Sequence, residues 1–523
     1  MRHASVGGDS CKRSERYGDT KRFRALLDHH DVIGTDGIGN IETQMMILKD
    51  KSVLVLGLGE TGLSMLRWLN AQGARLRAAD SRSEPPGLSR AAGYVAAKQI
   101  FCGNFNDPLF DGIELIAISP GVPLRNPAVA RAIARGIDVV GDIELFAQSL
   151  REGGTEGSGY PAAYPLRVLA NDHRPGILAI TGSNGKTTVT SMVEHLCKAA
   201  GKDVVAAGNI SPAVLDVVLE RGEQQPEVWV LELSSFQLET TYSLNADAAT
   251  VLNVSEDHLD RYADINQYSD AKARIFAGCG VQVLNRDDAR CMNMVHAGCK
   301  TITFGLSEPG SADDFGIEDA GGDIWLKQGK QRLLKAGEMQ VAGLHNVANA
   351  LAALALCRVI DIPMPDLIEG LRSFKGLPHR VERVAEIGGI TYYDDSKGTN
   401  VGATIAALKG LGCKAVLIAG GEGKGQNFAP LNPVVSRHAR AVVLIGSDAP
   451  MIAAALNGCG VKVVRAKDMS DAVHQAAGLA QSGDAVLLSP ACASFDMFRN
   501  YKHRAEVFVQ AVQELGKECA WHH

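Results

Sequence analysis

The sequence predicts an α/β protein of three domains with mostly parallel sheets. The chain has 523 residues, whereas a single domain usually holds roughly 100–200. Short runs rich in Val, Ile and Leu alternate with longer Ala/Leu-rich amphipathic segments, which is the pattern of βα units. These units fall into three groups along the chain, so we expect three sheets, each with its own core.

Composition narrows the class of protein. Hydrophobic residues are 46% and charged residues 21% of the chain, as in globular proteins. Its 53 Lys and Arg against 59 Asp and Glu give a net charge of −6, which argues against a nucleic-acid partner. The apolar run 350–357 ends at Arg358, far short of the ~20 residues that span a bilayer. We therefore expect a soluble protein without membrane insertion. A monomer is a separate expectation.

The cysteines and the amino terminus indicate the compartment. The 11 cysteines include no C-x-x-C pair, so they predict neither a disulfide framework nor a zinc site. They are typical of a reducing compartment. The amino terminus has no apolar core of a signal peptide. The predicted location is the cytoplasm.

Four segments are expected along the chain. Within residues 1–44, the segment 2–24 holds seven Lys and Arg against three Asp and Glu and has few aliphatic side chains, which predicts a disordered extension; the alternative is a short docked helix over 21–29. The domains are expected at 45–141, 142–377 and 378–523. Residues 153–175, rich in Gly, Pro and Ala, predict a linker, and Pro378 interrupts the pattern at the second boundary.

The first domain is predicted to be Rossmann-like. Its strands are expected at 52–56, 75–79 and 115–119. Gly57, Gly59 and Gly62 follow the first strand and open a helix, and Asp80 ends the next strand, as in G-x-G-x-x-G folds that bind a diphosphate and a ribose. A nicotinamide cofactor, a nucleotide-diphosphate substrate and a βα turn without a ligand all fit this pattern.

The central domain carries the strongest motif of the chain. Strands are expected at 177–180, 228–232, 248–253, 282–284 and 301–304. Residues 181–188, TGSNGKTT, follow the first of these and precede a helix. Glycine N–H groups and the helix terminus can cradle phosphates, Lys186 can neutralise them, and the Thr187 hydroxyl can bind Mg²⁺. Because Ile180 stands where the standard motif has glycine, this is a variant P-loop, and the domain is predicted to be of the P-loop ATPase type.

Two further segments of the central domain contain candidate site residues. Glu232 ends an apolar strand, where open α/β sheets present ligands. His258 follows the next strand, although a single histidine is more often structural. From its spacing alone, Lys272 is predicted to be a solvent-exposed lysine on a helix.

The third domain is predicted to be Rossmann-like, with a pocket for a carboxylate-rich small molecule. Strands are expected at 390–393, 415–419, 441–445, 462–464 and 485–488. Three of them are followed by DDSKGTN, GGEGKG and SPACASFD. Lys, Thr and Ser side chains at three neighbouring strand ends can bind carboxylates.

Seven ordered motifs carry a family resemblance: TGSNGKTT, LELSSFQLE, NVSEDHLDRY, GLHNVANALAA, GLPHRVE, DDSKGTN and SPACASFD. Over residues 46–516 the chain resembles a Mur ligase. The resemblance implies a cytoplasmic step of peptidoglycan synthesis. In it, ATP phosphorylates the carboxylate of UDP-N-acetylmuramoyl-L-alanine, and the amine of D-glutamate then attacks the acyl phosphate.

The resemblance also implies a role for individual residues. The ATP site would comprise Gly182, Ser183, Asn184, Gly185, Lys186, Thr187, Thr188, Asn349, Arg380 and Asp395. Two Mg²⁺ ions would be held by Thr187, Glu232, His258 and Lys272, with Lys272 carbamylated; the catalytic set would be Lys186, Glu232, His258 and Lys272. The UDP-sugar would contact Glu60, Thr61, Asp80, Ser81, Arg82, Gly121 and Asn209. D-Glutamate would contact Lys397, Thr399, Lys424 and Ser494, with Tyr501 as an aromatic neighbour.

Some departures and alternatives stay open at this point. Gly398 stands where the family motif has alanine, and residues 1–44 have no counterpart. The rival functions are a nicotinamide-dependent dehydrogenase, a non-catalytic nucleotide switch, a ligase for another amino acid and a folylpolyglutamate synthase. The three loops of the third domain favour D-glutamate.

Overall fold

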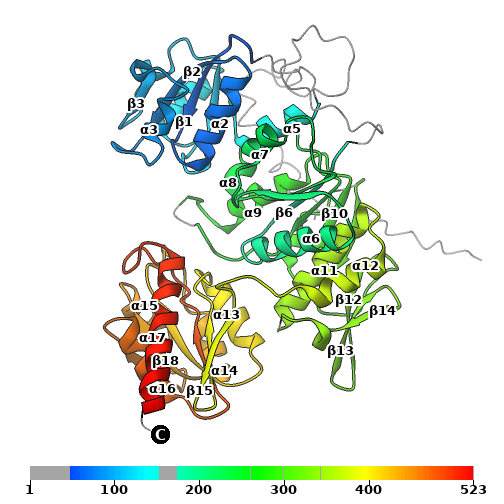
Figure 1. Ribbon diagram of the computed structural model, residues 1–523, viewed down its shortest axis with the longest axis vertical. Coiled ribbons are helices and arrows are strands. Elements are labelled where there is room, and N and C mark those ends of the chain that lie inside the picture. Colours follow the sequence, from blue (N-terminus) through cyan, green and yellow to red (C-terminus); the bar gives the residue numbers. More distant parts are fainter. Residues whose placement is uncertain (1–47, 152–173, 259–260, 297, 342, 522–523) are drawn as a thin grey trace, which may run out of the picture.

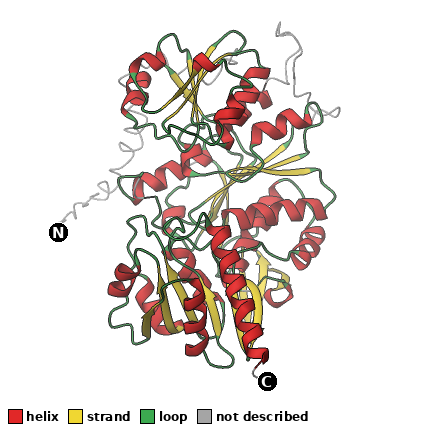
Figure 2. Cartoon of the chain, turned by 60° about the vertical axis from the view of Figure 1, so that its left-hand side comes forward, coloured by secondary structure: helices red, strands yellow, loops and turns green. Residues whose placement is uncertain are grey.

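The computed structural model describes residues 48–151, 174–258, 261–296, 298–341 and 343–521. Three α/β domains follow one another along the chain, coloured blue, green, and yellow to red in Figure 1. Helices lie on both faces of the sheets (Figure 2). The predicted fold class is confirmed. The predicted extension 1–44 and most of the predicted linker 153–175 lie outside the described residues.

The first sheet is fully parallel, in the order β3-β2-β1-β4-β5. Its strands are β1 (Ser52–Leu56), β2 (Arg75–Asp80), β3 (Ile100–Cys102), β4 (Leu115–Ile118) and β5 (Asp138–Val140). Its helices are α2 (Glu60–Ala71), α3 (Leu88–Ala91) and α4 (Pro127–Ala134), and α5 (Asp142–Arg151) leads from β5 into the central domain. The chain order reverses between β1 and β4, which is the switch point where such sheets bind ligands. β3 and β5 escape prediction because each has three residues.

The central sheet has the order β14-β13-β12-β11-β10-β9-β6-β8-β7. Its parallel part comprises β6 (Gly176–Thr181), β7 (Val204–Gly208), β8 (Val228–Glu232), β9 (Ala248–Val251), β10 (Val281–Asn285) and β11 (Lys300–Phe304). β12 (Phe315–Ala320), β13 (Asp323–Gln328) and β14 (Gln331–Lys335) continue it as antiparallel hairpins. Glycines with positive φ make their turns, including Gly321 and Gly322. These three strands, of which β14 lies at the edge of the sheet, are not predicted from the sequence, because their polar residues hide the strand pattern.

Seven helices surround the described part of the central sheet: α6 (Lys186–Ala199), α7 (Val214–Arg221), α8 (Ser235–Leu238), α9 (Ile265–Ala273), α10 (Ala289–Met292), α11 (Leu344–Val359) and α12 (Met364–Ser373). The apolar run 350–357 lies in α11 and is completely buried. α11 contacts both α6 and the strands β9–β12, so it is apolar because the core encloses it. Among the described helices, none has the length and apolar character to cross a membrane.

The third sheet has the order β15-β16-β20-β17-β18-β19 and is parallel except for β15. Its strands are β15 (Glu382–Ile387), β16 (Ile390–Asp394), β17 (Ala415–Gly420), β18 (Ala439–Ile445), β19 (Lys462–Arg465) and β20 (Ala485–Leu488). Its helices are α13 (Val401–Gly410), α14 (Leu431–His438), α15 (Ala449–Ala455), α16 (Met469–Leu479) and α17 (Tyr501–Trp521). Thus every strand predicted in the three domains is present.

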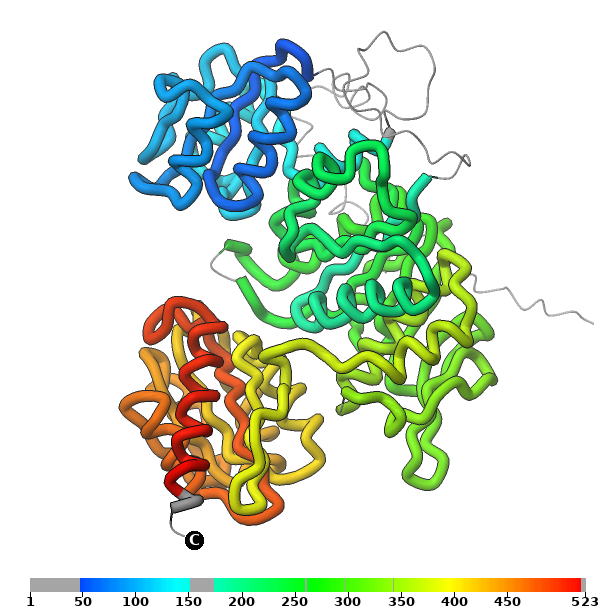
Figure 3. Tube along the Cα trace, in the orientation of Figure 1, coloured from blue at the N-terminus to red at the C-terminus, as the bar shows by residue number. Residues whose placement is uncertain are grey.

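The domains are not equally joined. One hydrophobic cluster runs from the first domain into the central domain. α5 makes this connection, since the rings of Phe146 and Trp229 lie 4.9 Å apart, edge to face. The third domain has clusters of its own. The chain crosses into it along the yellow segment after α12 (Figure 3).

Candidate active site at the strand ends

The loop between β6 and α6 has the backbone of a phosphate cradle. Gly182 and Gly185 take φ values of 153° and 84°, which side chains disfavour. A Cβ on Gly185 would lie 2.8 Å from Asn349 Oδ1, so Asn349 of α11 stands directly against the loop. The Lys186 ammonium donates to the carbonyls of Gly182 and Ser183 at 2.8 and 3.0 Å. Burial lowers its pKa. Thr187 and Thr188 lie in the first turn of α6.

A second loop braces this cradle. The Asn184 amide donates to Asn253 Oδ1 at 2.9 Å, and Asn253 Nδ2 donates back to the Asn184 carbonyl at 3.0 Å. Ser183 Oγ donates to the carbonyl of Ser255 at 3.0 Å. Asn253 and Ser255 are not among the predicted site residues, although both stand in the NVSEDHLDRY motif. The loop is therefore held in shape before any ligand binds.

Glu232 offers an unused carboxylate oxygen beside the cradle. Its side chain is 2% exposed, and Oε1 accepts from Asn209 Nδ2 at 2.8 Å. Oε2 is buried without a hydrogen-bond partner in the described part of the chain. A buried carboxylate oxygen without a partner is costly unless a cation or donor completes it, so Glu232 fits a divalent-ion ligand. Asn209, predicted to contact the UDP-sugar, thus lies beside Glu232 and the phosphate cradle.

Lys272 is 1% exposed, so the spacing-based expectation of a solvated lysine is wrong. Its Nζ donates to the Gly182 carbonyl at 2.9 Å and lies 4.4 Å from the centre of the Tyr268 ring. Burial, reinforced by the charge of Lys186, lowers the pKa of Lys272 well below its usual value. The residue lies in a nine-residue helix, α9, with weak apolar periodicity, and that is why its burial is not visible in the sequence.

His258 lies on the other loop of the site. Its φ is 56°, and its ring contacts Phe236 edge to face with centroids 4.9 Å apart. The ring centroid of Tyr268 is 6.3 Å from that of His258. Tyr268 therefore neighbours both His258 and Lys272, two residues that the family resemblance places at one metal site.

Arg380 enters from a strained segment between the central and third domains. His379 and Val381 have φ values of 62° and 52°, which is unusual for a β-branched residue. His379 is anchored through Nδ1 to Asp394 at 2.7 Å, and its amide donates to Glu382 at 2.8 Å. Burial lowers the pKa of Arg380, whose charge faces Glu232 and Asp395. Strain of this kind is often stored at functional sites.

The grouping of His379, Glu382 and Asp394 would also suit a metal ion by distance. The two hydrogen bonds just described connect all three residues. We therefore interpret the group as the support of the Arg380 segment.

The third domain presents a cluster of charges at the end of β16. Ser489 Oγ donates to Asp395 at 2.6 Å, and burial raises the pKa of Asp395 to about 7. The Lys397 ammonium lies 4.1 Å from the centre of the Tyr501 ring. Burial, followed by the charge of Arg380, lowers the pKa of Lys397 to about 8. Thus Asp395, Lys397 and Tyr501 are brought together with Arg380.

The other predicted residues of this pocket come from two paired loops. Glu422 and Ala493 exchange backbone hydrogen bonds of 3.1 and 2.8 Å. This pairing places the loop of Lys424 beside that of Ser494, which is 3% exposed.

Gly398 explains one departure from the family motif. A Cβ there would lie 2.4 Å from Asp395 Oδ2 and 2.8 Å from Ser489 Oγ. An alanine would require Asp395 or Ser489 to move. The glycine therefore allows the close Ser489–Asp395 hydrogen bond seen in this chain.

In the first domain, the acid at the end of β2 is tied to its own loops. Asp80 accepts from the Leu58 amide at 2.7 Å and pairs with Arg82 at 2.7 Å. Burial raises its pKa, but the hydrogen bonds from Arg82 and Leu58 outweigh burial and bring the pKa to about 2. The remaining predicted residues lie on the same edge: Glu60, Thr61, Ser81 and Gly121.

Two contacts bring this edge to the central domain. Ser211 Oγ donates to the carboxylate of Glu60. Arg261 donates to the Pro120 carbonyl at 2.7 Å and pairs with Glu239 at 2.8 Å. Arg261 is not a predicted site residue, although it ends the NVSEDHLDR segment.

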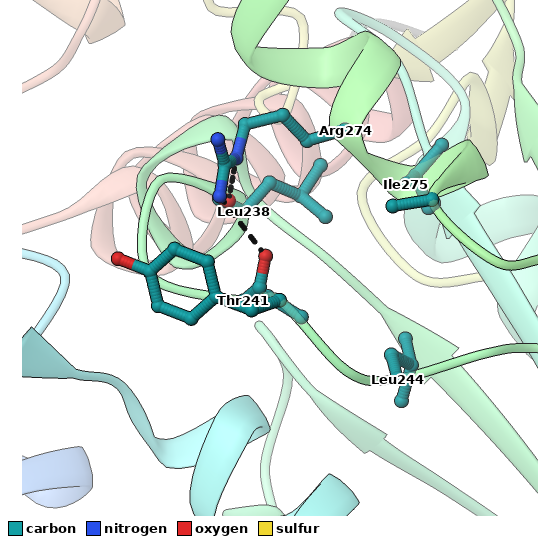
Figure 4. Close-up of a pocket in the computed structure, with 7 residues that line it drawn as sticks. Leu238, Thr241, Leu244, Arg274 and Ile275 are labelled. Carbon is teal, nitrogen blue, oxygen red and sulfur yellow. Dashed lines mark hydrogen bonds between the residues drawn. The ribbon is translucent and has the colours of Figure 1, made fainter. Parts of the chain in front are cut away.

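A small pocket lies away from these strand ends, lined by Leu238, Thr241, Tyr242, Leu244, Arg274, Ile275 and Ala277. Figure 4 shows the Arg274 guanidinium turned toward the carbonyls of Leu238 and Thr241, to which it donates at 2.6 and 3.1 Å. These hydrogen bonds join the end of α8 to the end of α9. We therefore interpret this pocket as a gap in the packing between the two helices and not as a ligand site.

Comparison with protein families gives three matches in chain order. Residues 51–141 match the N-terminal domain of MurD-like Mur ligases, and residues 180–357 match the Mur ligase middle domain. Residues 379–492 match the glutamate ligase domain of Mur ligases.

Curated relatives align over nearly the whole chain. A UDP-N-acetylmuramoylalanine–D-glutamate ligase from Nitrosospira multiformis is 56% identical over 474 residues, covering 90% of this chain and 97% of that protein. A ligase of the same name from Methylobacillus flagellatus is also 56% identical, covering 91% and 99%.

Solved structures share the fold at low sequence identity. MurF from Acinetobacter baumannii has a TM-score of 0.55 at 15% identity, covering 89% of this chain and 93% of its own. UDP-N-acetylmuramate–alanine ligase from Thermotoga maritima has a TM-score of 0.53 at 20% identity, covering 88% and 99%. At such identities the likeness concerns the fold alone.

Proposed function

This chain belongs to the Mur ligase family, and we propose that it adds D-glutamate to UDP-N-acetylmuramoyl-L-alanine in peptidoglycan synthesis, with conversion of ATP to ADP and phosphate. The 56% identity to two D-glutamate ligases over about nine-tenths of the chain carries this conclusion. Family membership sets aside the dehydrogenase and the non-catalytic switch. The boundaries 45–141, 142–377 and 378–523 are our proposal for its domains.

We propose that ATP binds the cradle at the end of β6. Residues 182–188 would hold its phosphates, with the Lys186 ammonium moving from the two loop carbonyls to the phosphate oxygens. Asn349 lies against the cradle from α11, and Arg380 and Asp395 approach from the third domain. Oε2 of Glu232, which has no hydrogen-bond partner in the described part of the chain, and the Thr187 hydroxyl are hard oxygen ligands of the kind that Mg²⁺ prefers. When bound, Mg²⁺ would neutralise phosphate charge.

The reaction has two steps. A carboxylate oxygen of UDP-N-acetylmuramoyl-L-alanine attacks the γ-phosphorus of ATP, giving an acyl phosphate and ADP. The D-glutamate nitrogen then attacks the acyl carbon, phosphate leaves, and the amine loses its proton as the amide forms. The repulsion between two polyanions is the main obstacle, and Lys186 and Arg380 are the cations placed to reduce it.

The first domain would bind the UDP moiety through Glu60, Thr61, Asp80, Ser81, Arg82 and Gly121, with Asn209 on the central domain. D-Glutamate would be held by Lys397, Thr399, Lys424 and Ser494 beside Tyr501. Domain approach would exclude water from the acyl phosphate, which water would otherwise hydrolyse.

We propose further that Lys272 works as a carbamate. Burial lowers the pKa of Lys272 well below its usual value, which favours the neutral amine, and a neutral amine can attack CO₂ and lose one proton. The product is an anion with two oxygens, suited to a second Mg²⁺ beside His258. The burial of Lys272 beside Lys186 supports this proposal.

The experiment that tests the function is phosphate release with ATP, UDP-N-acetylmuramoyl-L-alanine and a panel of amino acids. We expect release with D-glutamate and little with L-glutamate, L-lysine or meso-diaminopimelate. Preference for another amino acid, or activity with a folate in place of the UDP-sugar, would overturn the assignment. We also propose a cytoplasmic monomer, which sedimentation at assay concentrations would test for oligomeric state.

A further inference from the structure

The first turn of α13 touches the phosphate cradle of the central domain. Asn400, the residue before α13, donates from Nδ2 to Asn184 Oδ1 at 2.9 Å. The same nitrogen lies 3.4 Å from Asp257 Oδ2. Asn400 is 3% exposed. It belongs to the third domain, whereas Asn184 and Asp257 belong to the two loops of the central domain that form the site.

The side-chain amide of Asn400 is fully used. An amide has one acceptor oxygen and two N–H donors. The oxygen caps its own helix by accepting from the Ala403 amide at 2.9 Å. Both donors point across the domain boundary, one to Asn184 and one to the Asp257 carboxylate. Helix capping alone would be served equally well by aspartate or serine, so capping does not account for the two donors.

Gly402 is a second, independent sign of close approach. A Cβ on Gly402 would lie 3.1 Å from both Asn184 Nδ2 and Ser255 Oγ. The first turn of α13 therefore rests on the cradle with no room to spare. Figure 1 shows α13 on the side of the third domain that faces the central domain.

The amino-acid pocket begins immediately before this contact. Lys397 and Thr399 stand three residues and one residue before Asn400, in a loop tied to β20 through the Asp395–Ser489 bond. The position of Asn400 on the cradle therefore sets the distance between this pocket and the phosphates.

We propose that Asn400 is a positioning residue that docks the third domain on the phosphate loop, so that the bound amino acid faces the acyl phosphate. The identity of that amino acid rests on the proposed function; the docking contact does not.

The test is Asn400→Asp, which keeps the helix cap and the side-chain volume but removes both donors and places a carboxylate against Asp257. We expect kcat for phosphate release to fall about tenfold or more. The KM for UDP-N-acetylmuramoyl-L-alanine should stay within about twofold, and the melting temperature within about 2 °C. By small-angle X-ray scattering with a non-hydrolysable ATP analogue, the variant should have a larger radius of gyration than the wild type.

Asn126→Asp is the matched control. Asn126 caps α4 in the first domain by accepting from the Ala128 amide at 3.1 Å, and this substitution should change neither kcat nor the radius of gyration. A double-mutant cycle with Asp257 adds a measurement that does not depend on the stability of the fold. In an Asp257→Asn background the carboxylate introduced by Asn400→Asp meets an amide donor, so the substitution should cost at least several-fold less in kcat than in the wild type.

Wild-type kcat and radius of gyration in Asn400→Asp would overturn the proposal and leave Asn400 as a helix cap. A loss of activity that is the same in both backgrounds would also overturn it. If Asn400→Asp does not fold, Asn400→Ser keeps a cap but is too short to reach Asn184, and the same outcomes apply. Failure of the wild-type enzyme to use D-glutamate would refute the proposed function, while the scattering comparison would still decide the docking role.

Discussion

The Lys186 ammonium satisfies two carbonyls of its own loop, and phosphate oxygens would take their place. Lys186→Ala removes a charge-assisted hydrogen bond of about 1.5–3 kcal/mol. We therefore expect ATP turnover to fall roughly 10- to 150-fold or more, while binding of the UDP-sugar to the first domain persists in calorimetry. Lys198→Ala on the same helix is the control, because Lys198 forms an exposed pair with Glu194. Turnover within a few-fold of wild type would remove residues 182–188 from the phosphate site.

The proposed carbamate at Lys272 can be tested by its chemistry. Enzyme stripped of CO₂ should lose activity and regain it with bicarbonate, and Lys272→Arg should be inactive because guanidinium does not form the carbamate. Incubation with ¹³C-bicarbonate should give a carbamate carbon signal in NMR that is absent from Lys272→Arg. Full activity of Lys272→Arg would refute the carbamate.

Lys397 predicts a pH dependence of D-glutamate binding. Its pKa is lowered from 10.5 to about 8, so the ammonium is present at pH 7 and is progressively lost as the pH rises through 8. The KM for D-glutamate should therefore rise between pH 7 and 9, with the KM for ATP as internal reference. In Lys397→Arg the charge persists and the rise should be much smaller. An equal rise in both enzymes would assign the titration to another group.

At the scale of elements, the turn between β1 and α2 depends on a close backbone contact. A Cβ on Gly62 would lie 1.7 Å from the Gly57 carbonyl oxygen, so Gly62→Ala must push α2 away from the turn. Overpacking of this kind costs about 1–3 kcal/mol. We expect that loss in urea unfolding of the first domain, and weaker binding of the UDP-sugar with an unchanged KM for ATP.

Gly59→Ala is the matched control for stability. A Cβ on Gly59 would have nothing within 4 Å, and its φ of −88° suits any residue. A Gly62→Ala protein as stable as Gly59→Ala would show that α2 can shift at no cost.

At the scale of the whole molecule, Asp142 makes the joint between the first and central domains sensitive to pH. It is 1% exposed and accepts from Gln237 Nε2 at 3.1 Å, and burial raises its pKa from 3.8 to about 6. Between these two values the native state holds a proton that the unfolded chain has lost. The contribution of Asp142 to the free energy of unfolding is therefore present below pH 4 and lost as the pH rises through 6, by up to about 3 kcal/mol.

Urea unfolding at pH 4 to 7 measures this effect in wild type and Asp142→Asn. As the pH rises from 4 to 7, the free energy of unfolding of the wild type should fall relative to that of Asp142→Asn. Parallel curves would mean that Asp142 stays ionised when buried.

Much of the molecule is determined by the sequence itself. The parallel strands can be predicted because buried strands must be apolar along their whole length, as in residues 52–56 and 228–231. The phosphate loop can be predicted because glycines, a lysine and the start of a helix must stand together in a short segment. These are local requirements, so a local pattern reveals them, and the ordered motifs then indicate the family.

The tertiary structure decided which of these segments meet. Asn400 and Asn184 are 216 residues apart, and no local pattern relates them. The burial of Lys272 depends on the Gly182 carbonyl and the Tyr268 ring, which arrive from another strand end and from its own helix. The antiparallel strands β12–β14 form one end of the central sheet, and most of their residues are partly or fully exposed, so their position becomes apparent only once the sheet is assembled. Contacts between loops follow from how the strands are ordered in the sheets, and that order is a property of the whole chain.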